Sequence, residues 1–174
     1  FGLPRIAKNV EDYRRIINTS DIASESNCIT FCCGSFGSVQ ENDLPSMIRE
    51  FGPVGKIPFV HFRNIQRSDN GDFYESGHQT GCGSNDMWKI MEALYDMDQP
   101  FYLRPDHGRR IWNEAWRTKE IMLPDGTVKK EHRADGWNGV KPVAGYGIFD
   151  RALGAAYAQG LYEGIARTKN KRRV

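Results

Sequence analysis

The sequence predicts an α/β protein in which parallel strands alternate with helices. Short apolar runs rich in strand-forming residues are each followed by an amphipathic stretch with apolar residues at helical spacing. Strands joined in this way by helices form a parallel sheet through right-handed crossovers. Only three such strands are evident in the 174 residues, and so small a parallel sheet would leave its edges exposed. We therefore expect part of a larger assembly such as a (β/α)8 barrel.

The first three elements are predicted as a helix, a strand and a helix. Residues 9–20, NVEDYRRIINTS, have an N-cap residue, acidic residues in the first turn and apolar residues at helical spacing. Residues 28–33, CITFCC, form a short apolar run that stops at the Gly/Ser stretch GSFGS, which predicts a loop. Residues 42–52, NDLPSMIREFG, predict a capped helix that glycine closes.

The same order then repeats along the chain. Residues 57–62, IPFVHF, predict a buried strand, and residues 63–83 a long polar loop. Residues 84–98 follow as a strongly amphipathic helix, and PFYL at residues 100–103 begins a third strand that leads into RPDHG. Residues 146–167 predict a long final helix with several small side chains, which suit close packing on a sheet.

The segment between the third strand and the final helix is the least regular part of the chain. Residues 109–145 are polar and rich in turn residues. KEIML and TVKKEH flank the turn PDG, so the segment is predicted as an inserted loop or a small hairpin.

Composition narrows the class and the compartment. The formal net charge is only +2, too small to argue for nucleic acid or a membrane surface as a partner. No apolar run approaches the roughly 20 residues that span a bilayer, and the first residues do not form a signal peptide. The four cysteines have neither zinc-ribbon spacing nor the density of a small secreted domain, so we expect a reduced, cytoplasmic protein. The chain lacks an initiator Met, as if it were cut from something longer.

Potential metal ligands follow each predicted strand. Function in parallel α/β folds sits at the carboxyl ends of strands, and these ends lie side by side. A thiolate, an imidazole and a carboxylate together suit a borderline divalent ion such as Mn²⁺, Fe²⁺ or Zn²⁺. Each alone also has a structural explanation: a packed cysteine, a core histidine or a turn-forming aspartate. The strand ends hold Cys32 and Cys33; His61, Arg63 and Asn64; and Arg104, Asp106 and His107.

Three further side chains could take part in a site. Arg63 offers a fork of donors to a carboxylate or a phosphate, or forms a surface salt bridge. His78 lies in the long loop after the second strand, where it contacts substrate or is a solvent-exposed histidine. Tyr146 begins the final helix, either as a packing anchor or as a phenol acid or base. No nucleotide-binding glycine motif and no G-x-S-x-G nucleophile motif is present.

Several motifs together resemble the C-terminal part of mannonate dehydratase. They occur in the family's order, from residue 1 to about residue 110 and again from about 145 to 166, and their combination is far more specific than any one of them. They are FGLPRI, TFCCGSFG, NDLPSMIREFG, FVHFRN, FYESGH, NDMWKIMEAL, RPDHGR and GYGIFDRALGAAYAQGLYE.

The resemblance implies a metal-dependent (β/α)8 barrel of hexuronate breakdown that dehydrates D-mannonate to 2-dehydro-3-deoxy-D-gluconate. Residues 1–174 would then be the C-terminal part of a single barrel domain whose N-terminal half is missing from this chain. It implies Mn²⁺ (or Fe²⁺) as cofactor, and we expect a homo-oligomer. By resemblance the metal ligands are Cys32, His61 and Asp106, the catalytic residues are His107 and Tyr146, and the substrate-binding residues are Arg63, Asn64 and His78.

The chain also departs from the family pattern. A further metal-binding histidine of the family lies upstream of FGLPRI, and the segment 109–145 is longer than the resemblance leads us to expect. Cys33 stands beside Cys32 as a second possible ligand, but alternate residues of a strand face opposite ways, so both are not expected to bind. Two alternatives stay open: a related metal-dependent sugar isomerase or epimerase, and an inactive fragment that needs a partner piece.

Overall fold

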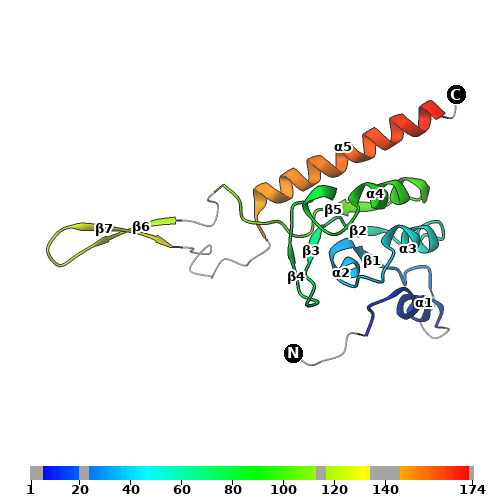
Figure 1. The fold of residues 1–174 in the computed structure, drawn as a ribbon, viewed down its shortest axis with the longest axis horizontal. Helices are drawn as coiled ribbons and strands as arrows, with labels where there is room; N and C mark the ends of the chain where they lie inside the picture. The colour runs from blue at the N-terminus through cyan, green and yellow to red at the C-terminus, as the bar shows by residue number, and fades with distance from the viewer. Residues whose placement is uncertain (1–5, 20–23, 113–116, 134–145, 173–174) are drawn as a thin grey trace.

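A three-stranded parallel sheet forms the centre of the computed structural model, which describes residues 6–19, 24–112, 117–133 and 146–172. The order is β1-β2-β5, so the strands of successive units lie side by side (Figure 1). Cys32 is paired with His61, and His61 with Arg104. This confirms the predicted parallel arrangement and brings the carboxyl ends of the three strands to one level. The strands are β1 (Thr30–Cys32), β2 (Phe59–His61) and β5 (Tyr102–Arg104).

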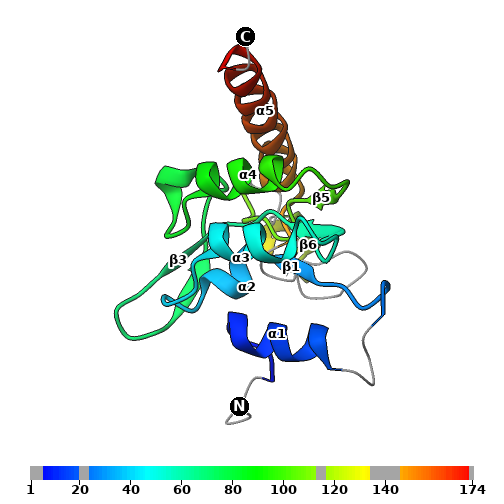
Figure 2. The same ribbon diagram turned by 90° about the vertical axis from the view of Figure 1, so that its right-hand side faces the viewer.

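The predicted helices are all present, with slightly different ends. Helix α3 packs against α4, and α4 against α5. Figure 2 shows α1, α3, α4 and α5 following one another in chain order, as expected where α3 and α4 connect neighbouring strands of the sheet. The four helices are α1 (Val10–Asn18), α3 (Leu44–Phe51), α4 (Met87–Asp96) and α5 (Ile148–Arg172).

Polar side chains set the starting points of three of these helices. The Asn9 side chain accepts a hydrogen bond from the backbone N–H of Asp12, and the Asp12 carboxylate accepts one from the backbone of Asn9. This reciprocal capping box confirms the predicted N-cap of α1. Asp43 and Asp86 cap α3 and α4, each by accepting from the backbone N–H three residues on. Each such cap stabilises its helix by about 1 kcal/mol.

One hydrophobic core lies between the sheet and its helices. The apolar stripe predicted for α4 is confirmed, because its four members are all buried. Two phenylalanines of the β1 and β2 segments and Ile48 of α3 are fully buried beside that stripe. Burial of this kind is the main driving force for folding. The stripe on α4 consists of Met87, Ile90, Met91 and Leu94, and the two phenylalanines are Phe31 and Phe62.

The Gly/Ser stretch after β1 forms a short helix, α2 (Cys33–Gly37), so the prediction of a loop was wrong. Its glycines permit close contacts rather than flexibility. A Cβ atom on Gly34 would lie 2.7 Å from Nε of Arg63, and one on Gly37 would overlap the amide of Asn85. The packing of Arg63 and Asn85 against Gly34 and Gly37 therefore outweighs the low helix propensity of these glycines.

The long polar loop after β2 also contains regular structure that the prediction missed. It holds the antiparallel hairpin of β3 (Ile65–Arg67) and β4 (Phe73–Glu75), followed by the 3-10 helix η1 (Thr80–Cys82). The signal was present, because Asn-Gly between two short strand-like runs is typical of a hairpin. Gly71 has a φ of 87°, the left-handed conformation that such a turn requires.

The segment between β5 and α5 contains the hairpin predicted from its turn residues. Strands β6 (Arg117–Met122) and β7 (Val128–Arg133) pair in antiparallel register, and Figure 1 shows them extending away from the other elements. The rest of the predicted insertion at 113–116 and 134–145 lies outside the described residues.

The described strands form an open sheet and two hairpins, not a closed barrel. The structure is therefore a mixed α/β arrangement around a parallel sheet. Among the described residues, no helix combines the length and apolar character that crossing a bilayer would require.

Candidate metal centre

Candidate ligands from three successive strands meet at the carboxyl edge of the parallel sheet. Cys32 ends β1, His61 ends β2, and Asp106 lies two residues after β5. One ligand atom from each of these side chains lies within 4.8 Å of the other two. Parallel pairing thus brings together the three residues that the family resemblance implied as ligands.

Asp106 lies at the middle of this cluster. Its Oδ2 atom is 3.5 Å from Nδ1 of His61 and 3.9 Å from Sγ of Cys32. Its other oxygen accepts a 2.7 Å hydrogen bond from Arg104. The residue is buried and has a φ of 40°, an uncommon conformation for a residue with a Cβ atom. Because such strain persists only where the surroundings enforce it, the fold holds this carboxylate in place.

His61 is held in the form that metals bind. Burial lowers the pKa of its imidazole, and this effect exceeds the upward effect of Asp106. The ring is therefore neutral at neutral pH, with a nitrogen lone pair available to an ion.

The two adjacent cysteines have different surroundings. Sγ of Cys32 accepts a hydrogen bond from the backbone N–H of Ser35 at 3.4 Å and lies 3.7 Å from Nη1 of Arg63. These donors suit the negative charge that a ligating sulfur carries. Cys33 points into the hydrophobic core, where burial raises the pKa of its thiol far above the ordinary value. The geometry favours Cys32 as the ligand. All four cysteines of the chain are free.

Arg63 is nearly buried, and a carboxylate of the same chain fills its fork. Nε and Nη2 donate to the two oxygens of Glu75 at 3.0 and 2.5 Å. The remaining nitrogen, Nη1, lies 3.8 Å from Oδ2 of Asp106. Burial alone would lower the pKa of Arg63, but the pairing with Glu75 outweighs it and the pKa is raised. The ion pair is thus an interior one, and contact of Arg63 with substrate stays a prediction.

The amide of Asn64 is used within the protein. Its Oδ1 accepts from the backbone N–H groups of Ile65 at 2.9 Å and Asn85 at 3.1 Å. Its Nδ2 donates to the carbonyl of Gln79 at 3.0 Å. Asn64 is 1% exposed, so these bonds tie the end of β2 to two later segments. Its predicted contact with substrate stays a prediction.

His78 is not the solvent-exposed loop histidine that was one of the two expectations for it. It is 3% exposed and packs against Gly154 of α5. Its Nε2 lies 3.3 Å from the carbonyl of Pro105, next to Asp106. Within the described residues, Nδ1 is buried without a hydrogen-bond partner. His78 therefore supports the loop that carries Asp106, and its contact with substrate stays a prediction.

His107 and Tyr146 lie side by side although 109–145 separates them in sequence. Their ring centroids are 5.0 Å apart. A parallel bridge joins Gly108 to Tyr146, and the backbone N–H of Gly147 donates to Gly108 at 2.9 Å. Nε2 of His107 is 3.4 Å from Oδ2 of Asp106. The two residues predicted to be catalytic thus adjoin the ligand cluster.

Three charged residues beside the site, Glu75, Arg109 and Asp150, were not among the predicted site residues. Oε1 of Glu75 lies 3.2 Å from Nδ1 of His107. Asp150 accepts from the backbone N–H of Arg109 at 2.7 Å and from its Nε at 3.0 Å. Burial raises the pKa of Asp150, but the hydrogen bonds from Arg109 outweigh burial and the pKa is lowered. The Asn-Gly turn signals the hairpin that carries Glu75, whereas the Arg109–Asp150 pair, 41 residues apart, has no local signal.

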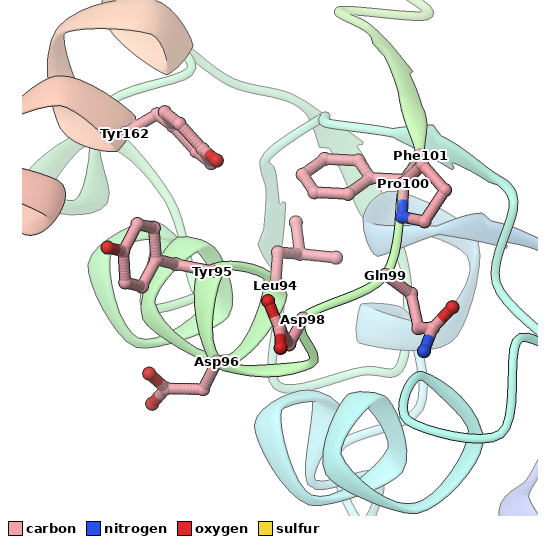
Figure 3. A pocket seen from close by; sticks show the side chains of 8 residues that line it. All are labelled: Leu94, Tyr95, Asp96, Asp98, Gln99, Pro100, Phe101 and Tyr162. Atoms are coloured by element: carbon pink, nitrogen blue, oxygen red, sulfur yellow. The ribbon is translucent and has the colours of Figure 1, made fainter.

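Two pockets flank β5 at its opposite ends. One, of about 650 Å³, lies where α4 ends and β5 begins; Figure 3 shows Tyr95 of α4, Tyr162 of α5 and Phe101 around it. It includes none of the candidate site residues. The other, of about 270 Å³, lies beside Asp106 and the start of α5, on the side where the ligand cluster is.

The donor set fits a divalent metal ion. A sulfur, an imidazole nitrogen and a carboxylate oxygen within 4.8 Å of one another are suitable ligands for a borderline ion. The three ligands found among the described residues leave coordination positions for a further ligand, a substrate or water.

Comparisons with known proteins point to one family. A protein-family model described as D-mannonate dehydratase (UxuA) matches residues 1–121. Mannonate dehydratases of Thermotoga petrophila and Oceanobacillus iheyensis are 41% and 45% identical to this chain, over 98% and 95% of its length. The matches cover 40% and 39% of those relatives, so the chain spans about two fifths of their length.

A solved structure gives the same result. The crystal structure of mannonate dehydratase from Streptococcus suis serotype 2 matches with a TM-score of 0.72 and 35% sequence identity. The match covers 98% of this chain and 41% of that one.

Proposed function

This chain belongs to the D-mannonate dehydratase family, and we propose that it forms the part of a mannonate dehydratase that carries the metal ligands and the proton-transfer groups. The reaction removes a proton from C2 of D-mannonate and the hydroxyl from C3, giving 2-dehydro-3-deoxy-D-gluconate and water. One observation supports this most directly: the ligand cluster and the His107–Tyr146 pair lie at the same end of the sheet.

Cys32, His61 and Asp106 would hold the metal, for which we propose Mn²⁺ or Fe²⁺. When bound, the ion would supply a Lewis acid at the carboxylate of the substrate and a neighbouring hydroxyl. Strand pairing and the strained backbone of Asp106 fix the positions of these three side chains. Binding of the ion would therefore require little rearrangement.

His107 and Tyr146 would transfer the two protons. An imidazole and a phenol both serve as general acids or bases, and ring centroids 5.0 Å apart suit neighbouring carbons of one small substrate. One of the pair takes the proton from C2 while the other protonates the hydroxyl that leaves C3. Nε2 of His107 faces the ligand cluster, so this nitrogen is the one we expect to act.

The proposed substrate is an anion, and the site offers positive charge for it. Arg63 presents Nη1 to the cluster beyond its pair with Glu75. We propose that this nitrogen orients the sugar acid. The described contacts of Asn64 and His78 favour a supporting role in which they hold the strand end and the loop.

We further propose that residues 1–174 are the C-terminal part of a single (β/α)8 barrel. Parallel strands in chain order, each followed by a helix, agree with this architecture. The bridge between Gly108 and Tyr146 adds a parallel contact just before α5, where a further barrel strand would lie. Residues outside this chain would complete the barrel, and an oligomer stays a prediction.

The proposal is tested by assaying loss of D-mannonate and formation of a keto acid. The protein is the longest natural polypeptide that contains these residues, loaded with Mn²⁺, and the 174-residue chain is assayed in parallel. We expect His107→Asn and Tyr146→Phe to lower turnover at least tenfold without changing metal content. Tyr162→Phe, at a tyrosine of α5 outside the site, is the matched control and should keep full turnover.

Three results would contradict the proposal. Keto-acid formation that neither substitution reduces would remove His107 and Tyr146 from the chemistry. Conversion of a sugar without loss of water would favour the isomerase or epimerase alternative. Turnover by neither polypeptide would favour an inactive fragment.

A further inference from the structure

We propose that Glu75 is a positioning residue that fixes both His107 and Arg63 with respect to the ligand cluster. The inference rests on the proposed role of His107 and assigns a role to a residue that was not among the predicted site residues, although it lies in the motif FYESGH. It is carried by the contacts that one carboxylate makes with these two side chains.

The Glu75 carboxylate bridges two groups that belong to different loops. Oε1 accepts a 2.5 Å hydrogen bond from Nη2 of Arg63 and lies 3.2 Å from Nδ1 of His107. Oε2 accepts from Nε of Arg63 at 3.0 Å. The side chains of Glu75, Arg63 and His107 are 22%, 9% and 27% exposed, so all three are at least partly shielded from water.

This pairing orients the ring of His107. The ring lies between two carboxylates, because Nδ1 faces Oε1 of Glu75 at 3.2 Å and Nε2 faces Oδ2 of Asp106 at 3.4 Å. Contact with Glu75 at Nδ1 therefore directs the opposite nitrogen, Nε2, to the ligand cluster. A buried carboxylate orients the catalytic or ligating histidine in the same way at many enzyme and metal sites.

The same carboxylate orients Arg63. A bidentate fork fixes the plane of a guanidinium group, and here it directs Nη1 to within 3.7 Å of Sγ of Cys32. Gly34 reinforces this position, because any side chain there would overlap Arg63. One carboxylate thus orients a positive charge and an imidazole toward the same point.

The hairpin of β3 and β4 explains how Glu75 reaches this position. Ile65, just after Arg63 and Asn64 in the chain, is paired with Glu75. The turn at Gly71 reverses the chain so that the end of β4 returns beside the end of β2. The hairpin, which was predicted to be a polar loop, therefore holds Glu75 beside the site.

The experiment compares Glu75→Gln with the unchanged protein, in the longest natural polypeptide that contains this chain. The amide offers one acceptor oxygen in place of two and carries no negative charge, so His107 or Arg63 loses its orientation. We expect kcat for D-mannonate to fall at least tenfold, more than KM changes, while bound Mn²⁺ per chain stays the same.

A second readout does not depend on activity. The ring centroids of His107 and Tyr146 are 5.0 Å apart, so nuclear Overhauser effects between their ring protons report the orientation of His107 in metal-free protein. We expect these effects in the unchanged protein and their loss in Glu75→Gln.

Two further variants complete the design. Glu50 forms a comparable fork with Arg14 on the exposed surface of α3, at 2.5 and 2.6 Å, so Glu50→Gln is the matched control and should keep kcat within twofold. Glu75→Asp retains the charge and should recover part of the lost kcat. If Glu75→Gln does not fold, Glu75→Asp replaces it as the test variant.

The outcomes separate this inference from the proposed function. If the unchanged protein does not dehydrate mannonate, the proposed function fails, and the nuclear Overhauser effects still decide the role of Glu75. If the unchanged protein is active but Glu75→Gln keeps kcat within twofold, or the contact between the rings of His107 and Tyr146 is unaffected, the inference is overturned.

Discussion

Two adjacent cysteines allow a sharp test of the candidate metal centre. We expect Cys32→Ser to abolish stabilisation by Mn²⁺ and Cys33→Ser to leave it intact. Sγ of Cys32 belongs to the set of ligand atoms within 4.8 Å of one another, whereas Cys33 is 0% exposed in the hydrophobic core. The same chemical change is thus made one residue apart in two different environments.

The size of the effect follows from linkage. An ion present at 100 times its dissociation constant stabilises the folded state by about 2.7 kcal/mol. For a chain of this size 1 kcal/mol shifts the melting temperature by about 2–4 °C, so Mn²⁺ should raise it by about 5–11 °C. Cys32→Ser should lose this shift. Cys33→Ser should keep it while losing about 1–3 kcal/mol without metal, because a hydroxyl group is buried in the apolar core.

The assay is thermal unfolding with and without Mn²⁺, together with elemental analysis of bound metal. The reasoning is refuted if Cys32→Ser retains the metal-dependent shift, or if Cys33→Ser loses it while remaining folded. The second result would transfer the ligand role to Cys33 and would require a different orientation of β1.

Two further predictions concern residues around the site. The pKa of Asp150 is lower in the folded state than in the unfolded chain, so its stabilising effect is complete above the unfolded value of about 3.9 and is lost as pH falls through the folded value. Asp150→Asn should remove this part of the acid dependence, which denaturant titrations between pH 2 and 7 would measure; an unchanged pH profile would contradict it. Gly34→Ala places a Cβ atom 2.7 Å from Nε of Arg63 and should destabilise the protein by about 1–3 kcal/mol. Urea unfolding measures this cost, and a change below about 0.5 kcal/mol would show that Arg63 can move aside.

Much of the site was predictable because it follows from the topology of a parallel sheet. The apolar runs that contain Cys32 and His61 were recognisable as strands, and parallel pairing of successive strands brings their carboxyl ends together. The supporting residues were harder to predict. Glu75 lies in a segment judged to be a polar loop, although its Asn-Gly turn indicated a hairpin.

Other features leave no trace in local sequence. The pairing of Arg109 with Asp150 joins the loop after β5 to α5 across an insertion, and no periodicity or motif encodes such a contact. The short helix α2 was missed for a different reason. Its glycines lower helix propensity, and only the positions of Arg63 and Asn85 reveal that they are needed for space.

The adjacency of Asp106 and His107 depends on a backbone conformation that strand alternation does not predict. In an extended chain, neighbouring side chains point to opposite faces, yet Oδ2 of Asp106 and Nε2 of His107 lie 3.4 Å apart. The left-handed φ of 40° at Asp106 makes this possible. Aspartate and asparagine tolerate that region better than most residues, so one residue type serves both the backbone and the metal.

This dual role leads to a last prediction. Asp106→Asn and Asp106→Val both remove the carboxylate, but only valine is strongly disfavoured at a positive φ. In metal-free protein we expect the valine variant to be less stable than the asparagine variant by about 1–2 kcal/mol, measured by urea unfolding. Equal stabilities would mean that the loop relaxes without cost once the carboxylate is gone. The position of His107 would then depend on Glu75 and Tyr146 rather than on the strained residue before it.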